Sequence, residues 1–86
     1  MTPKFHRRFI KQYRKLPKTH QEKCDARLLI FEKNSSDPML RNHALTGKYL
    51  GYRSIDITGS LRAIYRLLDQ DIAYFIAVDT HPNLYK

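Results

Sequence analysis

Apolar residues recur every three or four positions from Phe5 to Leu16, which is the spacing of an amphipathic helix. Thr2 and Pro3 match a helix start, with Thr as N-cap and Pro at the first helical position. Pro17 cannot continue a helix. The pattern therefore predicts a first helix from Thr2 to just before Pro17.

A second apolar stripe follows at helical spacing. Thr19 and Glu22 fit a capping box, in which each side chain accepts from a free backbone N–H. The helix is predicted to run to about Lys33, where the segment 34–38 (NSSDP) stops it. Pro17-Lys18 would join the two helices into an antiparallel hairpin. The stripe of the second helix contains Cys24, Leu28 and Phe31.

From Tyr52 onward the apolar period changes from 3.6 to 2, which indicates strands. Thr58–Ser60 is predicted to be a three-residue hairpin loop, with positive φ at Gly59. This register places Asp56 directly opposite Arg62. The predicted core face consists of Ile55, Ile57, Leu61, Ala63, Tyr65, Leu67, Ile72, Tyr74, Ile76 and Val78.

A second turn at Asp69-Gln70 would pair Leu67 with Ile72 and Ala63 with Ile76. A further short strand is expected around residues 44–48. The predicted class is α+β, an N-terminal α-hairpin packed on one face of a small, twisted, mostly antiparallel β-sheet. The opposite face would carry Asp56, Arg62, Arg66, Phe75, Ala77, Asp79 and, if the last strand continues, His81.

The 86 residues suit a single domain, 1–86, and no apolar run approaches the length of a membrane span. We expect a cytoplasmic protein without contact to a membrane. The net charge of +8 is typical of a polyanion binder, with nucleic acid as the leading partner and an acidic protein also compatible. One cysteine, Cys24, excludes an internal disulfide and indicates a small apolar residue on a helix face.

The four histidines lack the spacing of a metal site, so we expect no metal and no cofactor. Metal-free RNA cleavage needs a base for the 2′-hydroxyl, cations for the phosphorane and an acid for the leaving oxygen. Three structural alternatives stay open at this point. The charged face can be an ordinary solvated one, His43 can make a structural hydrogen bond, and Tyr85 can be an aromatic anchor for the tail.

Three segments carry a resemblance: NHALTGKYLGYRSID (42–56), GSLRAIYRL (59–67) and DTHPNLY (79–85). In this order and spacing they resemble the RelE/ParE superfamily of bacterial toxins, and within it the YafQ-like branch. The resemblance implies the RelE-like fold and an mRNA interferase that cuts translated mRNA in the ribosomal A site. It also implies the ribosome as a partner and silencing by a cognate antitoxin, which should be acidic.

Residue by residue, the resemblance implies that His43 matches the histidine of the family's H-x-L-x-G segment. His81 matches the histidine of its C-terminal T-H motif, which is a candidate for acid/base catalysis. Arg62 matches a strand arginine aimed at the scissile phosphate, and Tyr85 a C-terminal aromatic. Asp56 stands where the best-known pattern has another histidine, and Ser60-Leu61 stand where it has Asp-Trp.

The leading hypothesis is therefore a ribosome-dependent endoribonuclease in which His81 and Asp56 exchange protons. Arg62 and Lys48 would stabilise the phosphate, and Tyr85 would position the base. The remaining candidates are His43 as a further catalytic residue and Arg53 and Arg66 as phosphate contacts. Two alternatives stay open, a ParE-like toxin that poisons DNA gyrase without cutting RNA and an inactive toxin-like binding module.

Overall fold

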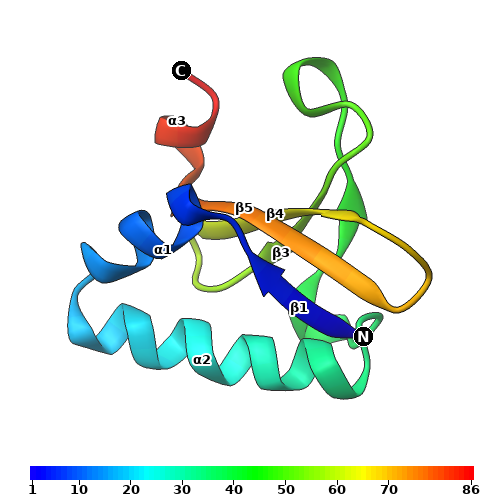
Figure 1. The fold of residues 1–86 in the computed structure, drawn as a ribbon. Helices are drawn as coiled ribbons and strands as arrows, with labels where there is room; N and C mark the ends of the chain where they lie inside the picture. The colour runs from blue at the N-terminus through cyan, green and yellow to red at the C-terminus, as the bar shows by residue number, and fades with distance from the viewer.

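Five strands form one mixed sheet in the order β1-β5-β4-β3-β2 (Figure 1). The computed structural model describes all residues, 1–86. The β1–β5 pair is parallel, and the other neighbouring pairs are antiparallel. The strands are β1 (Thr2–Phe5), β2 (His43–Ala44), β3 (Arg53–Asp56), β4 (Leu61–Leu67) and β5 (Ile72–Thr80).

The helices lie on both faces of this sheet. Both α1 (Arg7–Arg14) and α2 (Lys18–Lys33) contribute buried side chains to the main core on one face. The short α3 (His81–Leu84) and the 3₁₀ turn η2 (Gly47–Tyr49) cover part of the other face, and the 3₁₀ turn η1 (Pro38–Leu40) follows α2. The predicted α+β class with a helix pair on one face is confirmed. None of the helices combines the length and apolar character needed to cross a bilayer.

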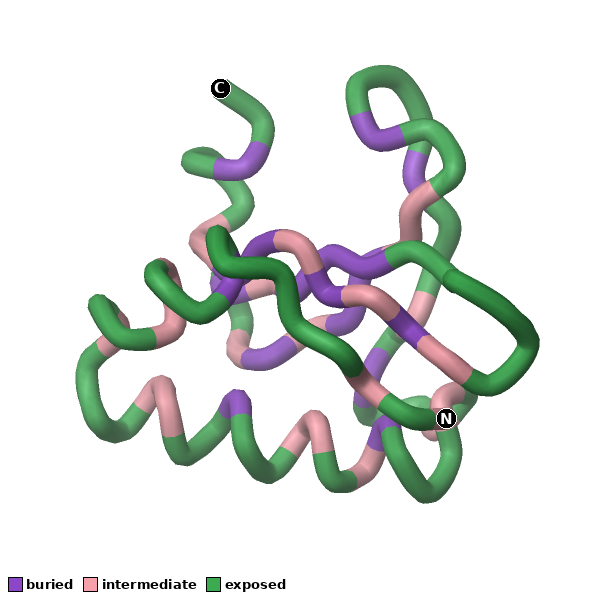
Figure 2. Tube along the Cα trace, in the orientation of Figure 1, coloured by how far each residue is buried: buried purple, intermediate pink, exposed green.

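Phe75 of β5 is fully buried at the centre of the main core. Its ring centroid lies 5.9 Å from that of Phe9 on α1, 5.2 Å from Phe31 on α2 and 5.0 Å from Tyr65 on β4. Figure 2 shows the buried positions concentrated on the strands and on single turns of the helices. The same core buries Cys24 completely, as predicted, and burial raises the pKa of its thiol to about 12.

The predicted start of the first helix at Thr2 is wrong, because Thr2–Phe5 is the strand β1. The parallel pairing with β5 satisfies part of an edge that would otherwise be open. The helix begins at Arg7, where the His6 side chain accepts from the Arg8 backbone N–H at 2.9 Å. Phe5 and Phe9 still meet, with ring centroids 4.9 Å apart, and this contact explains the misleading helical spacing.

The predicted capping box at Thr19 is also wrong. The second helix already begins at Lys18, its N-cap is Pro17, and no side chain caps it. The Pro17 carbonyl accepts from the backbone N–H groups of both His20 and Gln21, so Thr19 lies inside the first turn. The predicted end at Lys33 is confirmed, with Asn34 as C-cap.

The predicted register of β5 needs correction. Ala63 pairs with Val78, Leu67 pairs with Ala73, and an irregularity between Ile64 and Tyr65 shifts the register. Alternate residues of β5 are apolar on both faces, so the period-2 pattern could not identify the core face. In β5 the structure buries Ala73, Phe75, Ala77 and Val78, whereas Ile72, Tyr74 and Ile76 are only partly buried.

The second face of the sheet is less polar than predicted. A small second core forms there from η2, β4, β5, α3 and the residue after β2, and its buried members are Leu45, Tyr49, Ile64, Ala77 and Leu84. The β3–β4 turn is where predicted, but Gly59 does not have positive φ. The hydroxyl oxygen of Thr58 closes this turn by accepting from the backbone N–H of Leu61 at 3.1 Å.

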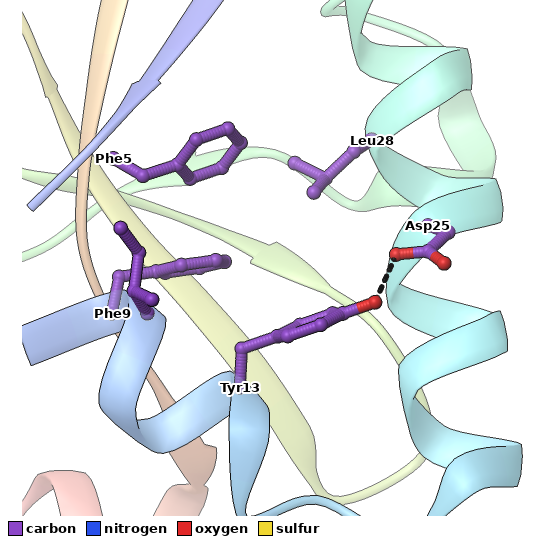
Figure 3. Close-up of a pocket in the computed structure, with 6 residues that line it drawn as sticks. Phe5, Phe9, Tyr13, Asp25 and Leu28 are labelled. Carbon is purple, nitrogen blue, oxygen red and sulfur yellow. Dashed lines mark hydrogen bonds between the residues drawn. The ribbon is translucent and has the colours of Figure 1, made fainter.

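An apolar groove of about 220 Å³ lies between α1 and α2 (Figure 3). At its edge the Tyr13 hydroxyl donates to Asp25 Oδ1 at 2.7 Å, which joins the two helices. This hydrogen bond, with some burial, raises the pKa of Tyr13 to about 12. The walls of the groove are Phe5, Phe9, Ile10 and Leu28.

Tyr13→Phe should lower the free energy of unfolding by about 1 kcal/mol at pH 7, because it removes one hydrogen bond to a charged acceptor at a partly exposed site. The folded-state pKa is raised, so the contribution is complete below about pH 10, the ordinary tyrosine value, and is lost as the pH rises toward 12. Urea unfolding at pH 7 and at pH 11.5 to 12 (about one unit or more above the ordinary value) measures this change.

The Tyr74→Phe variant is the matched control, because the Tyr74 hydroxyl donates to no protein group. Its free energy of unfolding at the two pH values provides the reference for the Tyr13→Phe measurement. A Tyr13→Phe variant as stable as the unsubstituted chain at pH 7 would contradict the assignment.

Candidate active site

A row of charged residues crosses three strands on the second face of the sheet. Asp56 of β3 lies opposite Arg62 of β4, and Arg62 lies opposite Asp79 of β5. Directly paired residues in an antiparallel sheet point to the same face. The predicted Asp56–Arg62 register is therefore confirmed.

Asp56 and Arg62 form an ion pair, with Arg62 Nε 3.0 Å from Asp56 Oδ1. The side chains are only 17% and 20% exposed, so solvent screens this pair less than one at the open surface. Arg62 Nη1 also donates to the backbone carbonyls of Thr58 and Leu61, at 2.8 and 3.2 Å. These contacts hold the guanidinium in place and leave Nη2 without a protein partner.

Asp79 does not join this ion pair, although it lies opposite Arg62. Its Oδ1 accepts from the Thr80 backbone N–H at 2.7 Å and from Asn83 Nδ2 at 3.1 Å. Asp79 therefore orients the chain where β5 turns into α3.

The continuation of β5 to His81, which the alternating pattern left open, does not occur. His81 begins α3 instead. Pro82 explains this change, because its fixed φ and missing N–H suit a first helical turn and not a strand. The His81 backbone N–H donates to the Ser60 carbonyl at 2.9 Å, which ties the tail to the β3–β4 turn next to Arg62. The imidazole is exposed, and its centroid lies 4.7 Å from the Tyr85 ring.

Lys48 and Tyr49 of η2 hold the tail from the other side. The Tyr49 hydroxyl and Lys48 Nζ both donate to the Leu84 carbonyl, at 3.1 and 3.3 Å. The Tyr49 ring meets the Tyr85 ring edge to face at 5.5 Å. Tyr85 therefore anchors the tail, and it is still 39% exposed next to His81.

His43 lies apart from this tail. It sits in β2, the outer strand, and its Nδ1 is 2.8 Å from the Arg41 carbonyl. A carbonyl only accepts, so Nδ1 carries the proton and Nε2 is free to accept one. Three strand spacings, about 14 Å, separate β2 from β5, so the fold does not bring His43 to His81.

The two remaining predicted arginines do not join the row. Arg53 points to the opposite, helix-covered face, where its Nε donates to Asn42 Oδ1 at 2.8 Å. Arg66 is on the same face as Arg62 but four residues further along β4, about 13 Å away, and stacks over the Tyr74 ring at 5.8 Å.

Sequence reasoning missed two residues near the row. Arg41 Nε lies 3.6 Å from Asp56 Oδ2, so the carboxylate faces two arginines. Tyr49 is a buried anchor of the tail. No periodicity marks either residue, because Arg41 follows η1 and Tyr49 ends η2, two turns of three residues that are too short to show a period.

The site thus offers a carboxylate, two guanidinium groups and, at the adjoining tail, an imidazole and a phenol. Imidazole exchanges protons near neutral pH, and guanidinium binds phosphate oxygens in a forked geometry. No three His, Cys, Asp or Glu side chains come together as a metal site. The arrangement is suited to proton transfer beside a bound phosphate.

No family model matches this sequence, and no curated protein sequence matches it significantly. Solved structures do match its fold. E. coli YafQ superposes with a TM-score of 0.78 at 21% identity, covering 98% of this chain and 97% of that one. YafQ in the E. coli DinJ–YafQ toxin–antitoxin complex gives 0.75 at 22%, with coverages of 98% and 96%. A YoeB/ParE toxin from Agrobacterium tumefaciens gives 0.77 at 19%, with coverages of 94% and 99%.

The chain therefore has the α+β fold of small bacterial toxins. Within that class the matched structures carry the names YafQ and YoeB/ParE, and the similarity extends over nearly the whole chain. The predicted RelE-like fold is confirmed.

Asp56→Asn should lower the free energy of unfolding by about 1 to 2 kcal/mol, because it removes the charge that faces the partly buried Arg62. The matched control is Asp71→Asn, at an exposed carboxylate without a side-chain contact, which should change stability by less than about 0.5 kcal/mol. Urea unfolding of both variants at pH 7 tests this difference. Equal losses would show that the ion pair adds nothing beyond an ordinary surface charge.

Proposed function

We propose that this chain is the toxin of a type II toxin–antitoxin pair and acts as a metal-independent endoribonuclease on translated mRNA in the ribosomal A site. The observation that carries the proposal is the Asp56–Arg62 ion pair on the second face of the sheet, with the His81 tail fixed beside it through Ser60. The similarity in fold to YafQ and YoeB/ParE toxins supports it.

The proposed reaction uses the RNA's own 2′-hydroxyl as nucleophile. The 2′-oxygen attacks the phosphorus, the bond from phosphorus to the 5′-oxygen breaks, and one proton leaves the nucleophile while another reaches the leaving oxygen. His81 and Asp56 are the acid/base pair in this proposal, with His43 as a further candidate. Arg62 Nη2 is free to stabilise the charge on the phosphorane.

Other residues bind and orient the RNA in this proposal. The exposed part of Tyr85 stacks on a base beside His81. Lys48, whose Nζ already reaches the tail, contacts a phosphate, and Arg66 adds a more distant contact on the same face. Arg53 is the weakest candidate, because its side chain points to the opposite face.

The proposed partners follow from the same surface. A net charge of +8 favours association with ribosomal and messenger RNA and with an acidic antitoxin. The DinJ–YafQ structure is a toxin–antitoxin complex of a protein with the same fold. We place the activity in the cytoplasm, where translation occurs.

His81→Ala should abolish mRNA cleavage and growth arrest while leaving the fold intact, because the imidazole is exposed and packs against the Tyr85 ring without a hydrogen bond to the protein. The chain is expressed from a tightly repressed promoter, and new mRNA 5′ ends are mapped in growing cells. The control is His20→Ala, a histidine on α2, which should leave the cuts unchanged.

The three outcomes separate the candidate functions. Cuts within translated codons that vanish only in His81→Ala support the nuclease. Growth arrest without new RNA ends would favour a gyrase-poisoning toxin of the ParE type. The absence of arrest would favour a binding module without activity.

Arg62→Ala should reduce cleavage about a hundredfold, the loss typical of removing one group that stabilises the transition state, and Arg66→Ala much less. Of these two arginines, Arg62 faces Asp56, whereas Arg66 stacks on Tyr74 at the other end of the face. The measurement is the rate of cleavage of a translated reporter mRNA on purified ribosomes, with circular dichroism to verify folding. Equal losses would instead indicate a diffuse basic surface.

A further inference from the structure

Arg41 adopts a backbone conformation that does not favour arginine. Its φ of 48° and ψ of 44° are left-handed, and no other residue besides glycine has positive φ. Glycine and asparagine adopt this conformation with less strain than arginine. An explanation for Arg41 has to come from its side chain.

The Arg41 side chain makes one weak contact. Its Nε lies 3.6 Å from Asp56 Oδ2, and the side chain is 80% exposed, against 20% for Arg62. An exposed ion pair at this distance adds little to folding stability. The contact therefore places the guanidinium next to the site without fixing it there.

The two arginines beside Asp56 differ in how they are held. Arg62 has two backbone carbonyls as further acceptors, whereas Asp56 is the only protein partner of the Arg41 guanidinium. Both Nη groups of Arg41 remain available as a planar fork, which matches two oxygens of a phosphodiester. An RNA phosphate can therefore take the place of the carboxylate as the partner of Arg41.

We propose that Arg41 is a phosphate-binding residue of this site, which leaves Asp56 and donates to the non-bridging oxygens of an RNA phosphodiester that lies at the Asp56–Arg62 pair. This inference rests on the proposed function and extends it to a residue that sequence reasoning did not find. Moving Arg41 to the phosphate also frees Asp56 Oδ2 to accept a proton.

The backbone of Arg41 has a separate structural role. Its carbonyl accepts from His43 Nδ1 at 2.8 Å, and substitution of the side chain leaves that carbonyl in place. Variants at position 41 can therefore test the guanidinium alone.

The test uses a short single-stranded oligoribonucleotide in which every 2′-hydroxyl is methylated, so that it keeps its phosphates but lacks the nucleophile. Fluorescence anisotropy gives its Kd over a series of KCl concentrations. Arg41→Gln should raise Kd about fivefold to tenfold, as expected for one lost charge-assisted contact. It should also reduce the slope of log Kd against log salt by about 0.7, the value for one phosphate on a single strand.

The matched control is Arg14→Gln, which removes the same charge from an exposed position in the last turn of α1. It should change Kd less than twofold and leave the salt slope unchanged. Arg41→Lys should recover part of the affinity, because it restores the charge without the fork. Equal weakening by Arg41→Gln and Arg14→Gln, or no binding by the unsubstituted chain, would overturn the proposal.

Arg41→Gly separates a binding role from a structural one. Glycine relieves the left-handed strain, so Tm should stay the same or rise while RNA binding weakens. A lower Tm together with weaker binding would point to a structural residue and overturn the inference. Binding that depends on Arg41 in a chain that cuts no mRNA would reject the proposed nuclease and leave the role of Arg41 standing.

Discussion

The burial of Phe75 is the constraint on which the rest of the structure depends. Its ring contacts Phe9, Phe31 and Tyr65, so it joins α1, α2 and β4 in one core. This contact fixes which face of β5 points toward the helices. The extra residue of β5 opposite the Ile64–Tyr65 step then sets the pairing of Arg62 with Asp79. The position of the tail beside the Asp56–Arg62 pair is therefore a consequence of packing on the other side of the sheet.

The sequence was sufficient for the α+β class and for the end of α2, which the segment 34–38 marks. It was also sufficient for the Asp56–Arg62 register, because strict alternation on either side of a short turn allows one pairing. It was not sufficient for β5, which is apolar on both faces, or for β1. The strand β1 forms because the edge of β5 is there to pair with, and that edge exists only in the folded sheet. Arg41 and Tyr49 were missed for a related reason, since both act through contacts with segments distant in sequence.

The geometry of the site divides its residues by how firmly each is held. Arg62 is held by three contacts and the Leu84 carbonyl by two donors, whereas the His81 imidazole and the Arg41 guanidinium extend into solvent. A site of this kind presents a firmly held central cation between exposed groups that have few contacts. Such an arrangement fits a large substrate that supplies part of the order itself, as the ribosome would in the proposed function.

The two cores on opposite faces of the sheet differ in size, with twelve buried residues on the helix side and five beneath the tail. Folding stability comes mainly from the larger one, and the chemistry-bearing side chains lie on the other. Substitutions of the exposed side chains of the site, such as His81 and Arg41, should therefore cost the fold little, because activity and stability depend largely on different surfaces. This separation gives a physical reason why proteins can keep this architecture over nearly their whole length with only about a fifth of their residues identical.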